Sequence, residues 1–185
     1  MKMLRCIKTS LIAGVVGLYG SAYALSTGPY ADINIGIANT ADNSYSTGFQ
    51  NQKKNKFAGG LNIGYMFMPN FGVEVGYANY NKVSYEQPVT LAKGSASLYG
   101  FDVALKGVYG LPVGPYLFAK AGIGYLIQDA VVNEPKYRRA TFFWGGGVGY
   151  DIFMGVYTQL TFTQNVAPGP VPRVFMTTLG LGYKF

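Results

Sequence analysis

The sequence predicts an all-β fold, an eight-stranded antiparallel up-and-down β-barrel that crosses a membrane. First, eight separate segments alternate apolar residues with small or polar ones, the two-residue period of a β-strand. Second, 49% of the residues are hydrophobic, whereas charged residues make up only 12%, about half of the ~25% typical of soluble domains. Third, no segment after residue 25 has the roughly 18 consecutive apolar residues of a membrane-spanning helix. A chain of this kind can satisfy its backbone in lipid only by closing its strands into a barrel.

The first 24 residues are predicted to be a cleaved secretory signal peptide. Lys2, Arg5 and Lys8 form a charged beginning, an apolar run follows over residues 11–20, and Ala22-Tyr23-Ala24 matches an A-x-A cleavage site. The alternative is an N-terminal anchoring helix, for which the apolar run is short. We therefore expect a signal peptide over residues 1–24 and one barrel domain over residues 25–185.

The first four strands are predicted from alternation that begins after Pro29. In the first, Ile33, Ile35 and Ile37 alternate with Asp32 and Asn34. The same period predicts the first four strands over residues 30–38, 57–67, 71–80 and 98–109.

The last four strands combine the same alternation with many glycines. Trp144, Val148 and Tyr150, for example, alternate with Gly147 and Gly149. These strands are predicted over residues 116–126, 142–153, 156–164 and 174–185.

The connections between the strands alternate in length. Segments 68–70, 110–114 and 153–155 are predicted as tight turns, whereas segments 39–56, 81–97, 127–141 and 165–173 are long and polar. Barrels of bacterial outer membranes have short periplasmic turns and long extracellular loops. An even number of strands places both chain ends on the short-turn side, so the long loops would face away from the cell.

Period two alone does not decide which face is the interior. In a soluble, lipocalin-like barrel the bulky apolar residues would point inward. The opposite face here is rich in glycine, which gives a strand no compensating packing in solvent. Outward aromatic residues also gather near both strand ends with aliphatic residues between them, which is typical of the aromatic girdles of membrane barrels. We therefore predict that the apolar face contacts lipid.

Several motifs resemble small outer-membrane β-barrels of the OmpA/OmpX type. They are Gly28-Pro29-Tyr30, the segments 71–77 and 120–125, Gly147-Val148-Gly149-Tyr150-Asp151, and the C-terminal segment 179–185. The resemblance covers the whole predicted barrel and implies the eight-stranded transmembrane domain without the peptidoglycan-binding domain of longer relatives. It also implies that the last strand is read by the barrel-assembly machinery through the outward residues Leu179, Leu181, Tyr183 and Phe185.

Four charged residues are predicted to point into the barrel: Glu74, Asp102, Lys106 and Lys120. With a turn centred near Pro112, paired residue numbers would sum to about 224, which places Lys120 diagonal to both Asp102 and Lys106. The family resemblance suggests that such a network can act as a gate. The alternative is a structural network that fills the interior, because an uncompensated buried charge is costly.

Enzymatic and cofactor chemistry is not expected. The sequence has no histidine, and its one cysteine, Cys6, lies in the predicted signal peptide. Histidine-based catalytic triads, imidazole bases and Cys/His metal sites are therefore excluded. The run Gly145-Gly146-Gly147-Val148-Gly149 lacks the spacing of a dinucleotide-binding motif. We predict no catalytic, metal-binding or cofactor-binding residues and no nucleic-acid partner.

The predicted loops carry an excess of basic residues, nine lysines and arginines against four acids. The loop surface that we single out consists of Lys53, Lys54, Lys56, Lys136, Arg138 and Arg139. It would attract lipopolysaccharide phosphates or acidic host glycans, although an ordinary solvated surface explains the same charges.

The predicted function is a non-enzymatic, monomeric outer-membrane barrel that supports the membrane and presents four loops to lipopolysaccharide or a host ligand, in the manner of an adhesin. Its expected partners also include periplasmic chaperones. The alternative function is a small pore gated by the interior charges.

Overall fold

Nine strands and no helix occur in the part of the chain that the computed structural model describes, residues 27–41, 50–51, 56–86, 93–112, 114–129, 136–166 and 173–185. The predicted signal peptide lies outside these residues. No helix long and apolar enough to cross a membrane occurs among them. The strands are β1 (Gly28–Ala41), β2 (Gln50–Asn51), β3 (Lys56–Met68), β4 (Phe71–Glu86), β5 (Lys93–Gly110), β6 (Pro115–Gln128), β7 (Tyr137–Phe153), β8 (Val156–Val166) and β9 (Arg173–Lys184).

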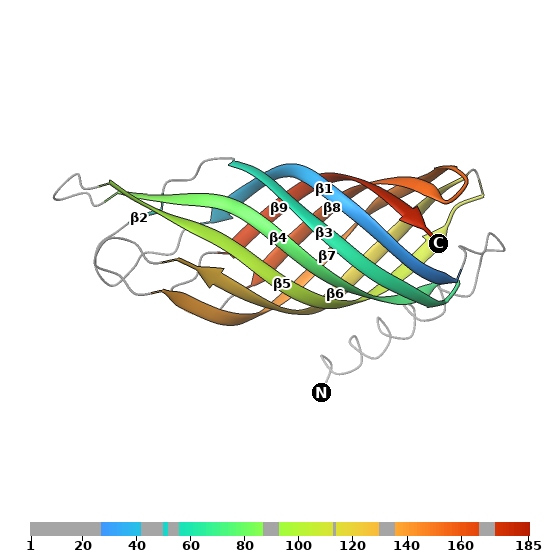
Figure 1. Cartoon of the computed structure of the whole chain (residues 1–185), viewed down its shortest axis with the longest axis horizontal. Coiled ribbons are helices and arrows are strands. Elements are labelled where there is room, and N and C mark those ends of the chain that lie inside the picture. The colour runs from blue at the N-terminus through green and yellow to red at the C-terminus, as the bar shows by residue number, and fades with distance from the viewer. Residues whose placement is uncertain are drawn as a thin grey trace, which may run out of the picture.

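Eight of these strands form a closed barrel (Figure 1). Every barrel strand pairs antiparallel with the next one along the chain, and β1 pairs with β9 to close the sheet. The two-residue strand β2 pairs only with the far end of β4, so it adds to an edge above the barrel. The predicted eight-stranded up-and-down barrel is confirmed.

Three tight turns and both ends of the described barrel lie at one end, which we call the turn end. The turn between β7 and β8 has positive φ angles at Met154 (43°) and Gly155 (84°). The backbone amide of Phe185 donates a hydrogen bond to the carbonyl of Pro29 at 2.9 Å, so the first and last strands are fastened together here. Figure 1 shows the C-terminus at this end of the barrel. We call the opposite end the loop end.

The predicted long loop over residues 81–97 is wrong. β4 continues to Glu86 and β5 begins at Lys93, and these two residues pair. A bulge between Asn79 and Lys82 interrupts the pairing, with Asn81 at a φ of 64°. The side-chain oxygen of Asn79 accepts a hydrogen bond from the amide of Asn81 at 2.9 Å, which holds this bulge. Beyond the apolar part of the barrel a strand needs no apolar alternation, so the polar sequence did not reveal the extension.

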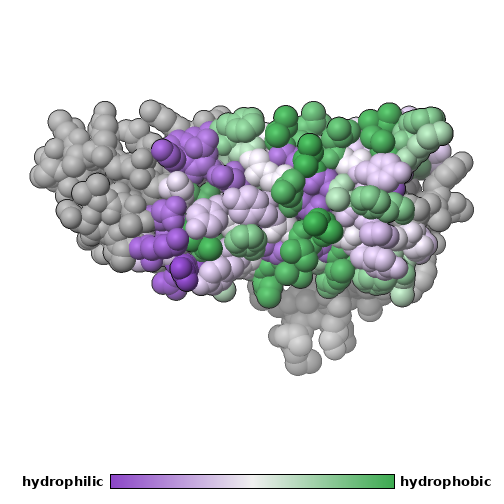
Figure 2. Space-filling view, viewed as in Figure 1, coloured by the Kyte–Doolittle hydropathy of each residue, from purple (hydrophilic) through white to green (hydrophobic). Residues whose placement is uncertain are grey.

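The alternation of faces follows the prediction. The outward side chains of Ile33, Leu61, Val103 and Leu181 are 52–56% exposed, whereas inward residues such as Glu74 are buried. Figure 2 shows hydrophobic residues over most of the visible barrel surface and hydrophilic residues gathered toward the loop end. Exposed aromatic residues occur near both ends, as expected for girdles: Tyr65, Tyr150 and Tyr183 at the turn end, and Phe57, Phe142 and Phe162 at the loop end.

Inward glycines make room for large inward side chains. The rings of Tyr30, Tyr116 and Tyr157 lie against the glycines directly opposite them on the neighbouring strand, which are Gly64, Gly149 and Gly182. A Cβ atom at any of these three glycines would collide with the tyrosine ring. These glycines therefore have a packing reason: an eight-stranded barrel is narrow, and these three inward tyrosines need a neighbour without a side chain.

Candidate functional site

Glu74 on β4 is the centre of a buried charge cluster in the barrel interior. Its carboxylate accepts hydrogen bonds from the Lys120 ammonium at 2.6 Å and from the Lys106 ammonium at 3.1 Å. The Tyr30 hydroxyl donates a third bond to it at 2.9 Å. Lys106 also lies over the Tyr30 ring, 4.6 Å from its centroid. One carboxylate therefore serves two ammonium groups and a phenol, with almost no access to solvent.

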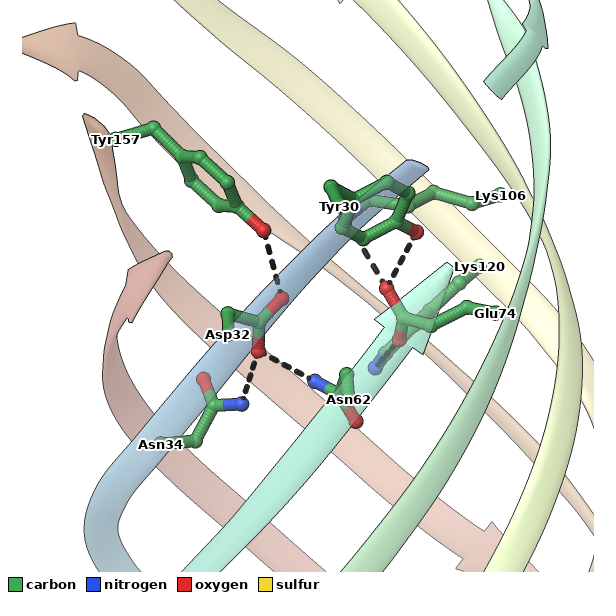
Figure 3. Close-up of polar contacts among 8 residues, drawn as sticks. All are labelled: Tyr30, Asp32, Asn34, Asn62, Glu74, Lys106, Lys120 and Tyr157. Carbon is green, nitrogen blue, oxygen red and sulfur yellow. Dashed lines mark hydrogen bonds and ion pairs between the residues drawn. The ribbon is translucent and has the colours of Figure 1, made fainter. Parts of the chain in front are cut away.

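Asp32 on β1 is the centre of a second cluster beside the first (Figure 3). The Tyr157 hydroxyl donates to one of its carboxylate oxygens at 2.9 Å. The side-chain amides of Asn34 and Asn62 donate to the other oxygen at 2.5 and 2.8 Å. The rings of Tyr30 and Tyr157 meet edge to face with centroids 6.4 Å apart, so the two clusters share a packed boundary.

The sequence analysis placed Asp32 opposite the aliphatic face of its strand but named neither Asp32 nor Tyr157 in the charge network. The two residues are 125 positions apart, and they meet only because β1 pairs with β9 and β9 with β8. The one signal available in the sequence was an acidic residue and a tyrosine on faces otherwise rich in glycine and small polar residues. Tyr30 was missed because the inward face of the first strand was described only from Asp32 onward.

Asp102 was predicted in the network, but the structure keeps it apart. Among the described residues it forms no ion pair with either lysine, and its Oδ1 atom has no hydrogen-bond partner. Its carboxylate lies with the Asn62 side-chain oxygen over Gly76.

The cause is a wrong prediction of register. Paired residues of β5 and β6 sum to 226, so Lys106 faces Lys120 directly and Asp102 faces Gly124. The last pair before the turn is Gly110 with Tyr116, which places the centre of the turn one residue later than predicted. Lys120 therefore lies two inward positions along β6 from Gly124, the residue that pairs with Asp102. The predicted register would have placed Lys120 diagonal to Asp102.

Side chains close the interior at both ends. At the loop end a buried cluster includes Tyr80, Leu98, Leu126 and Val174. At the turn end Lys184 forms an ion pair with Asp151 at 2.5 Å and lies over the rings of Tyr116 and Tyr157. A cavity of about 20 Å³ beside Tyr30 and Lys106 has room for roughly one water molecule.

The basic surface at the loop end is only partly described. Lys136, Arg138 and Arg139 are exposed at the beginning of β7. Lys136 forms an ion pair with Asp129 at 3.0 Å and donates a hydrogen bond to the Tyr99 hydroxyl at 3.3 Å. The hydrogen bond to Asp129 has the largest effect and the one to Tyr99 the next, and both raise the pKa of Lys136 above the usual value for lysine.

The other predicted basic residues have different surroundings. Lys56 is half-buried at the beginning of β3, and its ammonium donates to the backbone carbonyl of Lys82. Lys53 and Lys54 lie outside the described residues.

A family model described as the outer membrane protein β-barrel domain matches residues 9–185 of the chain. The chain belongs to this family. Solved structures of similar fold include small eight-stranded outer-membrane barrels, and no curated protein matches the chain in sequence.

Three solved structures are similar in fold to this outer-membrane barrel. Neisserial surface protein A (NspA) is 15% identical with a TM-score of 0.61, over 86% of this chain and 98% of that one. Ail, the attachment invasion locus protein of Yersinia pestis, is 16% identical with a TM-score of 0.56, over 87% and 100%. OprG of Pseudomonas aeruginosa is 14% identical with a TM-score of 0.61, over 89% and 100%. At these identities the likeness shows the fold alone.

In the outer-membrane barrel, the outward residues of β9 and the following Phe185 form an exposed apolar row. Leu179, Leu181, Tyr183 and Phe185 are 45–72% exposed, and the rings of Tyr183 and Phe185 meet edge to face. The described residues contain no group of three or more His, Cys, Asp or Glu side chains suited to a metal ion.

Proposed function

We propose that this protein is a non-enzymatic outer-membrane barrel that supports the membrane and contacts acidic ligands through a basic extracellular surface. The observation that carries the proposal is the set of exposed side chains Lys136, Arg138 and Arg139 above an interior closed at both ends. Clustered cations attract phosphate, sulfate and carboxylate groups. One structure of similar fold, Ail, was solved in complex with the heparin analogue sucrose octasulfate. The ligands that fit this surface are lipopolysaccharide phosphates and acidic host glycans.

Cell binding tests this function. Cells that carry the wild-type protein, or none, are compared for binding to heparin-coated and matrix-protein-coated surfaces. A variant with Lys136→Glu, Arg138→Glu and Arg139→Glu should lose the gain in binding, whereas Lys136→Arg, Arg138→Lys and Arg139→Lys should keep it. Equal binding of both variants, at equal surface amounts, contradicts the role of this basic surface.

The remaining parts of the proposal concern export and assembly. We propose that residues 1–24 are removed on export and that the barrel functions as a monomer. We further propose that chaperones deliver the chain to the barrel-assembly machinery, which binds the outward row of β9. A mature N-terminus other than Leu25 in outer-membrane fractions would contradict the predicted cleavage.

A small pore is the second candidate, because polar atoms line the middle of the interior. The buried side-chain oxygens of Thr141, Gln159 and Thr161 have no hydrogen-bond partner among the described residues, and neither has Asp102 Oδ1. Water or small ions would satisfy such atoms. Conduction would require the side chains at both ends to move, so the two candidates differ in single-channel conductance.

A further inference from the structure

Three side-chain oxygens converge over Gly76 on β4, inside the barrel. Gly76 pairs with Asn62 on β3 and with Asp102 on β5, so these two side chains reach the glycine from opposite sides. At the place where any other residue has its Cβ atom, Asp102 Oδ1 and Oδ2 lie 2.6 and 2.9 Å away, and Asn62 Oδ1 lies 2.8 Å away. We call these three oxygens and the space above Gly76 the Gly76 site.

The oxygens of the Gly76 site are all hydrogen-bond acceptors. The side-chain nitrogen of Asn62 donates to Asp32 at 2.8 Å (Figure 3), and this bond fixes the amide so that its oxygen faces Asp102. Asp102 Oδ1 is buried and has no hydrogen-bond partner among the described residues. A carboxylate and an amide oxygen that face each other repel unless a positive charge lies between them.

The charges of the two neighbouring clusters cancel and leave Asp102 uncompensated. Glu74 is bound to both Lys106 and Lys120, so the first cluster has one positive charge in excess. The Asp32 carboxylate beside it accepts hydrogen bonds from neutral groups only, and its negative charge balances that excess. The Asp102 carboxylate therefore remains without a counter-charge, which is costly in a protein interior.

The other inward lysines are engaged near the two ends of the barrel. Lys184 is paired with Asp151 at 2.5 Å at the turn end. The ammonium of Lys56 donates to the backbone carbonyl of Lys82 at the loop end. The described part of the chain thus offers Asp102 no ammonium group of its own, and the missing positive charge must come from solution.

We propose that the Gly76 site binds one monovalent metal cation, held by the Asp102 carboxylate and the Asn62 side-chain oxygen. Carboxylate and carbonyl oxygens suit hard cations, which need neither the cysteine nor the histidine that the barrel lacks. One positive charge neutralises the interior, whereas a divalent cation would leave it positively charged. The site is independent of the basic extracellular surface, and it needs no open channel because the cation can bind as the barrel folds.

A proton on Asp102 is the competing explanation. A protonated carboxyl group would donate one hydrogen bond to Asn62 Oδ1 and would need no free space above Gly76. The convergence of both carboxylate oxygens and the amide oxygen on one point favours a metal cation instead. The two explanations differ in whether stability responds to the cation or to pH.

Urea unfolding of the refolded barrel tests the proposal, with Na⁺ as the probe. NaCl is compared with choline chloride at equal ionic strength and neutral pH, since choline is too large for the site. Binding to the folded state alone raises the folding equilibrium constant about tenfold when Na⁺ is at ten times its dissociation constant. Wild type should therefore unfold at a higher urea concentration in NaCl than in choline chloride.

Two variants should abolish this response to Na⁺. Asp102→Asn removes the charge and provides an amide that can donate to Asn62, so it should unfold at the same urea concentration in both salts. Gly76→Ala places a Cβ atom among the three oxygens and should also lose the response. The matched controls are Asp129→Asn, an exposed acid, and Gly107→Ala, an outward glycine with room for a Cβ atom; both should keep it. If Gly76→Ala does not refold, Asp102→Ala takes its place.

Three outcomes would overturn the proposal. The first is an equal gain in stability from Na⁺ in wild type and Asp102→Asn. The second is a wild type that ignores Na⁺ and is stabilised by acidification through Asp102, because the counter-charge would then be a proton. The third is stabilisation through Asp102 by Mg²⁺ and not by Na⁺, which would contradict the single positive charge. Binding of cells to heparin plays no part in these measurements, so failure of the Gly76 site and failure of the basic surface can be told apart.

Discussion

Lys106 and Lys120 lie directly opposite each other on β5 and β6, and both contact Glu74 on β4. Two facing cations in a narrow interior would repel each other strongly, because low dielectric strengthens the repulsion. The carboxylate accepts one ammonium on each of its oxygens, at 3.1 and 2.6 Å. Glu74 therefore compensates the charges of both lysines in this layer of the barrel.

Removing Glu74 should destabilise the barrel more than removing any exposed acid. Glu74→Ala leaves two buried lysines without their carboxylate, and loss of one partner of a buried ion pair costs about 3–5 kcal/mol. The matched control is Asp129→Ala, which breaks the exposed pair with Lys136 and should change stability little. Urea unfolding of the refolded barrels measures both, and equal midpoints for Glu74→Ala and wild type would contradict the network.

The second cluster gives an independent prediction at Tyr157. Tyr157→Phe removes one hydrogen bond to the Asp32 carboxylate and keeps the ring, so it should cost about 1.5–3 kcal/mol. Tyr116→Phe is the control, because the described residues show no hydrogen bond to its hydroxyl while its ring packs in the same way against a glycine. If the two variants unfold at the same urea concentration, the Tyr157–Asp32 hydrogen bond contributes nothing to stability.

Glycine 182 should be intolerant of even one added methyl group. Gly182→Ala places a Cβ atom in the Tyr157 ring, and such overpacking costs about 1–3 kcal/mol. At outward Gly107 the nearest atom to an added Cβ lies 3.8 Å away, so Gly107→Ala should leave stability near wild type. Thermal unfolding of the two variants compares them. If Gly182→Ala is as stable as wild type, the Tyr157 ring can move to another position in the interior.

Conductance in planar bilayers should be absent in the wild type. The side chains of Leu98, Leu126 and Val174 fill the loop end independently of the charges, so Lys120→Ala alone should also remain closed. Refolded protein is added to the bilayer at both polarities and single-channel currents are recorded. Discrete openings in the wild type that disappear in Lys120→Ala would instead support the pore.

The architecture could be predicted from the sequence because the alternation within each barrel strand shows which of its residues point inward and which point outward. Ile33, Leu61 and Leu181 alternate with small or polar neighbours, and a two-residue period needs no knowledge of distant partners. The basic residues at the beginning of β7 could be found for the same reason, since charge and exposure at the end of a strand are local properties. Closure of β1 onto β9 followed from the need to pair every strand edge in lipid.

The details of the interior could not be predicted because they depend on register. A shift of one residue in the centre of the β5–β6 turn moves Lys120 from a position diagonal to Asp102 to one opposite Lys106. The Asp32–Tyr157 contact requires the registers of two successive strand pairs at the closing seam. The extension of β4 depends on a bulge, which hydrogen bonds of Asn79 and Asn81 hold in a polar segment.

The most direct test of the account asks whether the apolar face contacts lipid. Nitroxide labels are placed at Leu61, Val103 and Leu181, whose side chains are 52–53% exposed on three different strands, and at Arg138 as an aqueous control. In bilayers the account predicts that the three apolar positions are accessible to oxygen and shielded from a water-soluble nickel relaxant, while the label at Arg138 is relaxed by nickel. Nickel relaxation at Leu61, Val103 and Leu181 equal to that at Arg138 would contradict the account, because the face assigned to lipid would then lie in water.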